Sequence, residues 1–163
     1  MTVTATKLDK DALTMTITAE FDAPVAAVWQ IWANPRLLER WWGPPTYPAT
    51  MIEHDLSPGG TVTYFMTSPE GEKHHGWWRV RSVEAPKRLS FEDGFGDAAG
   101  RPNLDMPVTT TTVHFDAQAS RRTRMVIMTT FASLANMEQV IAMGMEEGMC
   151  LALGQIDALL AKA

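Results

Sequence analysis

Hydrophobic and polar residues alternate strictly near the start of the chain. From Leu13 to Phe21 every second residue is apolar, and the residues between them are threonines and one glutamate. An extended segment with a period of two buries one face and exposes the other. The pattern therefore predicts a β-strand with one face against a core.

The apolar spacing changes to three and four residues directly after this strand. Pro24 suits the first turn of a helix, and Asn34 followed by Pro35 has the pattern of an N-cap and the first position of a second helix. The second helix should end near Trp42, because Gly43 is a typical C-terminal stop. Two short helices are therefore predicted. The apolar positions of the first are Val25, Val28, Trp29 and Trp32.

Six further strands are predicted from about residue 50 onward. Turn sequences such as SPGG and PEGE separate most of them, so neighbouring strands should pair antiparallel. Helical spacing of apolar residues from Ala135 to Ala161 then predicts one long C-terminal helix. The six strand segments are 50–56, 61–68, 74–84, 89–95, 108–117 and 122–132.

The order of elements predicts an α+β fold with an antiparallel sheet of about seven strands. A sheet with one apolar face needs a cover, and the long C-terminal helix is the element large enough to supply it. The chain has 163 residues and shows no internal repeat or linker. We therefore expect a single domain over residues 1–163, with a core from about residue 13 to residue 160.

Two glycines interrupt the apolar face of the predicted C-terminal helix. Gly144 and Gly148 each cost about 1 kcal/mol relative to alanine in a helix interior. One interpretation is close approach of the helix to the sheet, which spacing alone favours because interiors are usually close-packed. The other is a void between helix and sheet, flanked by Met137 and Met145, whose flexible side chains would shape it.

Alternation along the strands separates the inward from the outward side chains. In HHGWWRVRSV the set with two arginines should face water, so Gly76, Trp78 and Val80 should face the helix. Inward threonines reflect strand propensity, or else they orient a ligand in an otherwise apolar pocket. The other side chains expected inside are Tyr64, Met66, Leu89, Phe91, Asp93, Thr109, Thr111, Val113, Phe115, Met125, Ile127, Thr129 and Phe131.

Two adjacent tryptophans end the second predicted helix, in the sequence ERWWGPP. Neighbouring residues on a helix point about 100° apart, so the two rings cannot share a face. Trp41 shares a face with Leu37 and Leu38, four and three residues earlier, and is predicted to anchor the helix on the core. Trp42 is then predicted at the rim of a cavity.

Composition and charge exclude several classes of protein. A net charge of −5 with no extended basic cluster argues against nucleic-acid binding, and no apolar run approaches the ~18 residues of a membrane-spanning helix. Cys150 is the only cysteine, so no internal disulfide can form, and without a leader sequence after Met1 the cytoplasm is the expected location.

Motifs for metal, cofactor or nucleophilic chemistry are absent from the sequence. No nucleophile elbow, phosphate-binding glycine loop or dinucleotide fingerprint occurs. His74 and His75 are adjacent in a strand and project to opposite faces, so together they cannot chelate one metal. No metal and no cofactor are expected. Asp93 is the one carboxylate expected near the mouth of a pocket, and a polar strand end at the start of a loop explains its position equally well.

Several stretches together resemble the activator of heat-shock-protein-ninety ATPase homologue-like family, within the START-like, or SRPBCC, superfamily. They are FDAPVAAVWQIWANPRLLERWWGP, DLSPGG, PEGEKHHGWWRVRSVEAPKRLSFEDGF, TRMVIMTTFAS and GMEEG, in the family's order from about Leu13 to Leu160. The resemblance implies a helix-grip fold, in which a curved antiparallel sheet wraps a long C-terminal helix around an apolar cavity. It thereby favours the void interpretation of the two helix glycines.

The resemblance implies a binding protein more readily than an enzyme. Family members are mostly small-ligand binders or proteins without assigned activity and share no universal catalytic constellation, so no catalytic residue is carried over. The co-chaperone that names the family has a separate N-terminal domain for chaperone binding, for which this chain has no room. Chaperone activation is therefore not expected.

Three functions remain open at this point. The first is binding of a small hydrophobic or aromatic ligand between sheet and helix. The second is an enzyme resembling a polyketide cyclase or hydrolase, with Asp93 and Tyr64 as acid and base. The third is a protein-interaction or stress-response module related to chaperone ATPase activators, or a homodimer, using the outward apolar residues Phe65, Trp77, Met143 and Cys150. The residues expected to contact a ligand are Trp42, Tyr64, Met66, Trp78, Phe91, Asp93, Thr111, Ile127, Thr129, Met137, Ile141, Gly144 and Met145.

Overall fold

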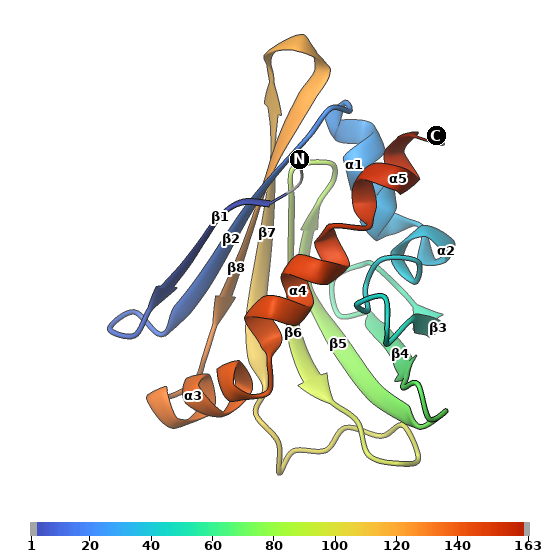
Figure 1. Ribbon diagram of the computed structural model, residues 1–163, viewed down its shortest axis with the longest axis vertical. Coiled ribbons are helices and arrows are strands. Elements are labelled where there is room, and N and C mark those ends of the chain that lie inside the picture. Colours follow the sequence, from blue (N-terminus) through green and yellow to red (C-terminus); the bar gives the residue numbers. More distant parts are fainter. Residues whose placement is uncertain (1–2, 162–163) are drawn as a thin grey trace.

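One antiparallel sheet of eight strands forms the body of the molecule, and the helices lie on one of its faces (Figure 1). The computed structural model describes residues 3–161, and the spatial order of the strands is β1-β2-β8-β7-β6-β5-β4-β3. The strands are β1 (Val3–Asp9), β2 (Thr14–Phe21), β3 (Ala49–His54), β4 (Thr61–Thr67), β5 (Lys73–Glu84), β6 (Arg88–Phe95), β7 (Thr109–Gln118) and β8 (Arg122–Thr130). The helices are α1 (Val25–Ala33), α2 (Pro35–Leu38), α3 (Leu134–Ala142), α4 (Met145–Leu153) and α5 (Ile156–Ala161), with a 3-10 turn at Ala119–Arg121.

The seven predicted strands all form, in the predicted order and with antiparallel pairing. The eighth strand, β1, was not predicted. It pairs with β2 at one edge of the sheet, and most of its side chains are exposed on both faces. A strand that buries neither face carries no apolar period, which explains why alternation did not reveal it.

The C-terminal segment is three helices, so the prediction of one long helix is wrong. Gly144 separates α3 from α4 with a φ of +88°, a left-handed conformation that favours glycine and commonly ends helices. A second break follows Gly154. There the Gln155 side-chain amide donates a hydrogen bond of 2.7 Å to the carbonyl of Gly43, tying this break to the turn after α2. Apolar periodicity continues across both breaks, which is why it suggested one helix.

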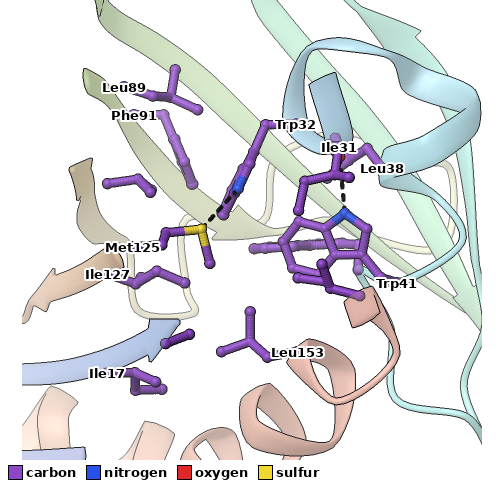
Figure 2. Packing of buried hydrophobic residues seen from close by; sticks show 14 of the residues in the cluster. Ile17, Ile31, Trp32, Leu38, Trp41, Leu89, Phe91, Met125, Ile127 and Leu153 are labelled. Atoms are coloured by element: carbon purple, nitrogen blue, oxygen red, sulfur yellow. Dashed lines mark hydrogen bonds between the residues drawn. The ribbon is translucent and has the colours of Figure 1, made fainter. Parts of the chain in front are cut away.

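Trp32 of α1 lies at the centre of the hydrophobic core. Its indole N–H points at the sulfur of Met125, 3.3 Å away, as Figure 2 shows. The ring also meets Trp41 edge to face, with centroids 4.8 Å apart. This aromatic cluster fills the space between α1, α2 and the adjoining part of the sheet, and each fully buried aromatic side chain contributes roughly 2–3 kcal/mol through removal from water.

The predicted inward face of the sheet is the buried one. Trp78, Val80 and Phe91 are at most 1% exposed. Trp77, expected to supply apolar surface on the outer face, is only 9% exposed, so that expectation is wrong. Its ring covers the backbone of Gly94, and its indole N–H donates a hydrogen bond of 3.0 Å to the Phe95 carbonyl.

Candidate functional site

A cavity of about 780 Å³ lies between the sheet and the segment that joins α3 to α4. It opens to solvent, because two of its lining residues, Met143 and Tyr47, are 54% and 37% exposed. Methionine and aromatic side chains are the largest group in its walls and supply an adaptable apolar surface. These are Trp42, Tyr47, Tyr64, Met66, Phe95, Met106, Met143, Met145 and Met149.

Six of the thirteen predicted ligand-contact residues line this cavity. They come from the turn after α2, from β4 and β6, and from the start of α4, which are distant in sequence and brought together by the sheet order. The six are Trp42, Tyr64, Met66, Asp93, Gly144 and Met145.

The other seven predicted residues belong to the packed interior. Trp78 and Phe91 stack with ring centroids 3.9 Å apart, and both are fully buried. Thr111 and Thr129 are buried partners in the β7–β8 ladder, and Ile127 is 1% exposed. In α3, Met137 is buried and Ile141 packs against the core. None of the seven contributes to the cavity wall.

Several cavity residues were missing from the prediction. Thr109 lines the cavity at the start of β7, and Val140 and Met149 face it from the helices. The loop between β6 and β7 adds Asn103 and Met106, which carry no periodic signal because they lie outside any strand or helix. His74 also lines the cavity, and alternation along β5 could have predicted its inward direction, because it shares a strand face with Gly76 and Trp78.

The two tryptophans of ERWWGPP lie in the turn after α2, because α2 ends at Leu38, so the predicted helix end near Trp42 is wrong. Their division into an anchor and a cavity residue is nevertheless the predicted one. Trp41 is fully buried, and its indole N–H donates a hydrogen bond of 2.9 Å to the carbonyl of Ile31. Trp42 lines the cavity and is 5% exposed. The anchoring role of Trp41 is confirmed, whereas contact of Trp42 with a ligand remains a prediction.

Gly148 marks open space rather than close packing. A Cβ atom added there would meet no heavy atom within 4 Å, and the same holds at Gly144. Both glycines line the cavity. The close-approach interpretation of these glycines is therefore wrong: Gly144 is required by its left-handed backbone, and Gly148 leaves room beside α4.

Gly76 of β5 allows a polar contact between strands that are not neighbours. Tyr64 on β4 is paired with Gly76, and a Cβ at Gly76 would lie 2.5 Å from the Tyr64 hydroxyl oxygen. Because Gly76 has no side chain, the tyrosine ring crosses over β5. Its hydroxyl donates a hydrogen bond of 3.5 Å to Oδ1 of Asp93 on β6.

Asp93 is a desolvated carboxyl in the cavity wall, and with Tyr64 it forms a polar corner there. Burial raises the pKa of the Asp93 carboxyl from 3.8 to about 7, and the hydrogen bond from Tyr64 opposes that rise. Burial, followed by the nearby Asp93 charge, raises the pKa of the Tyr64 hydroxyl well above its usual range. The carboxyl therefore exchanges its proton near neutral pH, while the tyrosine stays protonated and donates.

Two indole N–H groups beside this corner lack a hydrogen-bond acceptor. Nε1 of Trp42 and Nε1 of Trp78 are buried and have no partner among the described residues. Both lie close enough to the Tyr64 hydroxyl to lower its pKa, although neither N–H reaches hydrogen-bond geometry with its oxygen. The polar corner therefore contains one directed hydrogen bond, from Tyr64 to Asp93, with two unpartnered indole N–H groups beside it.

A curved antiparallel sheet with helices on one face and a cavity between them defines a helix-grip protein. The family model described as "Activator of Hsp90 ATPase homolog 1-like protein" matches residues 22–161. The chain therefore belongs to this family.

Solved structures agree with this assignment. A crystal structure of a Mycobacterium smegmatis protein is 52% identical, with a TM-score of 0.89 over 97% of this chain and 96% of that one. A solution structure of an Arthrobacter aurescens protein is 49% identical, with a TM-score of 0.94 over 99% and 94% of the two chains. A Nitrosomonas europaea protein is 26% identical, with a TM-score of 0.80 over 95% and 97%. Among curated proteins, none matches.

Residues 3–161 contain neither a metal-binding cluster nor a membrane-spanning helix. No cluster of three His, Cys, Asp or Glu side chains that could hold a metal ion occurs in this part of the chain. No helix within it is long and apolar enough to cross a membrane.

Proposed function

We propose that this protein binds a small hydrophobic or aromatic molecule in the cavity between the sheet and α4. The observation that carries the proposal is the cavity itself, which at about 780 Å³ falls in the size range of ligand pockets. Its methionine-rich wall adapts to ligand shape, and Asp93 with Tyr64 supplies the few polar groups by which such pockets orient a ligand.

The proposal is tested with 1-methylnaphthalene as an apolar aromatic probe. Binding is followed through the indole N–H signals in ¹H–¹⁵N spectra, where the Trp42 signal should shift and saturate. Gly148→Leu should abolish the shift, because its side chain grows into open cavity space. Gly154→Leu is the matched control, since Gly154 also has a helical backbone but lies outside the cavity wall. An unchanged Trp42 signal in the wild type, or an equal shift in Gly148→Leu, would contradict the proposal.

A second candidate function is proton transfer on a bound substrate. It is favoured by the 3.5 Å contact between the Tyr64 hydroxyl and Asp93, whose carboxyl has a pKa near 7 and so suits a general base at neutral pH. A methyl ketone with the same ring, 1-acetylnaphthalene, tests it in heavy water. Deuterium should enter its methyl group faster with wild type than with Asp93→Asn. Equal rates would eliminate this function.

A further inference from the structure

We propose that the cavity selects apolar molecules whose inner end carries a hydrogen-bond donor, above all a protonated amine, and that Asp93 accepts this hydrogen bond. The inference rests on the proposed ligand-binding function and specifies the class of ligand. It follows from three observations. Tyr64 donates its hydrogen bond to Asp93, Asp93 has no positively charged partner within residues 3–161, and aromatic side chains line the cavity wall.

Asp93 accepts the hydrogen bond that Tyr64 donates. Tyr64 has a single hydroxyl proton, and it is directed to Oδ1 of Asp93. The indole nitrogens of Trp42 and Trp78 are buried, so their N–H groups are not accessible from the cavity. Tyr64, Trp42 and Trp78 therefore offer no free donor to a ligand, whereas the Asp93 carboxylate retains accepting capacity, because an ionised carboxylate takes up to about four hydrogen bonds.

Asp93 has no cationic partner within residues 3–161. The ion pairs in this part of the chain join other residues, including Arg101, which pairs with Asp97 in the following loop. The titratable side chains that neighbouring elements contribute to the cavity wall are those of Tyr64, His74 and His75, together with Tyr47 from the turn after α2. On α4, Glu146 lies beside Cys150 instead of the cavity.

A ligand ammonium supplies the counter-charge that the protein lacks. Hydrogen bonds between a charged donor and a carboxylate are roughly twice as strong as neutral ones, and a desolvated site strengthens them further. Trp42 and Tyr64 line the same cavity, and aromatic rings attract cations through their ring electrons. An anionic or purely accepting head would meet the Asp93 carboxylate and would be repelled.

The test compares three probes with one ring system: 1-methylnaphthalene, 1-naphthylmethanol and 1-naphthylmethylamine. Dissociation constants are measured at about pH 8, where the Asp93 carboxyl is ionised and the amine is protonated. The amine should bind about tenfold more tightly than the methyl compound, with the alcohol between them. Asp93→Asn should abolish the tenfold gain and leave 1-methylnaphthalene binding unchanged. Glu92→Gln, on the same strand but outside the cavity wall, should retain it.

The outcomes separate this inference from the proposed function. If 1-methylnaphthalene fails to bind the wild type, the proposed function fails and the inference fails with it. If 1-methylnaphthalene binds but the amine gains nothing, or gains equally in Asp93→Asn, only the inference is overturned. Tighter binding of 1-naphthylacetate than of the amine, with a shift of the Trp42 indole signal, would also overturn it. The spectrum of Asp93→Asn establishes that the variant is folded.

The pH dependence of amine binding distinguishes a direct contact with Asp93 from a purely structural role of this residue. Lowering the pH from about 8 to about 5.5 should remove most of the amine's advantage, because protonated Asp93 offers no counter-charge. The affinity for 1-methylnaphthalene should stay constant over the same range. His74→Gln and His75→Gln should leave the pH dependence of the amine in place, and its loss in either variant would overturn the assignment to Asp93.

Discussion

Replacing Asp93 with asparagine should change how the stability of the protein depends on pH. The substitution keeps the size and shape of the side chain and removes its titratable proton. In the folded protein the pKa of this carboxyl is about 7, against an ordinary value of 3.8, mainly because burial disfavours its charged form.

The sign of the effect follows from proton binding in the two states. Between about pH 4 and pH 7 the folded protein holds a proton on Asp93 that the unfolded chain has released. The stability contributed by this proton is complete below the unfolded pKa and is lost as the pH rises through the folded pKa. The free energy of unfolding therefore falls across this window and stays at the lower level above pH 7.

The magnitude is set by the pKa and by residual hydration. One pKa unit corresponds to about 1.4 kcal/mol, so the fall between pH 5 and pH 8 is at most about 3 kcal/mol. Asp93 is partly exposed at the cavity surface, so its charge is screened by solvent. We expect a loss of about 1–2 kcal/mol in the wild type and none from this position in Asp93→Asn.

Urea unfolding of both proteins at several pH values measures the effect. Other groups titrate in the same range, so the relevant quantity is the difference in unfolding free energy between wild type and variant at each pH. The variant should gain stability relative to the wild type as the pH rises from 5 to 8. Parallel curves, or a gain in the opposite direction, would refute the reasoning that Asp93 is a desolvated carboxyl without a counter-charge.

Three further predictions concern the residues around the cavity and are measured by urea unfolding. Trp41→Phe should destabilise the protein by about 2–3 kcal/mol, because it loses packing and a hydrogen bond. Trp42→Phe should cost about 1 kcal/mol less, because the N–H that it removes is buried and unpaired. Equal losses of stability in the two variants would contradict this prediction. Gly144→Ala should destabilise the protein by about 1–2 kcal/mol, because alanine disfavours the left-handed backbone at this position. Gly148→Ala should stabilise it by about 0.5–1 kcal/mol, because alanine is the better helix former and its methyl group meets open space. Changes of the same sign in the two variants would refute this prediction. Gly76→Ala should destabilise and shift the indole signals of the cavity, because the added methyl group overlaps the tyrosine ring crossing this strand; an unchanged spectrum would refute that placement.

Most of the fold could be predicted because it rests on local periodicity. Seven strands have one buried face, so their alternation is visible, and the Asn34 cap of α2 is a local signal that the structure confirms through a hydrogen bond from the Arg36 N–H to the Asn34 side chain. The exceptions have physical causes. Strand β1 buries neither face, and the break at Gly144 depends on a backbone conformation that leaves the apolar period intact.

The sequence predicts which face of the sheet carries the candidate site. It does not predict where along the strands the site lies. Phe91 and Asp93 are two residues apart on β6 and share the inward face, yet Phe91 is sealed in the core and Asp93 lines the cavity. The difference arises from Trp32, whose ring lies near Phe91, with centroids 6.3 Å apart, and fills that end of the sheet. Periodicity assigns a side chain to a face, whereas the filling of each end depends on contacts between distant elements.

The contact between Tyr64 and Asp93 had one trace in the sequence, which is the glycine in HHGWW. A glycine inside a strand weakens it and often marks a place where another group approaches the backbone closely. The inward direction of Gly76 follows from alternation, but the approaching group could be identified only from the register that pairs Gly76 with Tyr64 and sets β6 on the other side of β5. Because β4 and β6 are not adjacent, any larger residue at position 76 would separate the hydroxyl from the carboxyl. The hydrogen bond between Tyr64 and Asp93 therefore depends on Gly76, which contributes only by having no side chain.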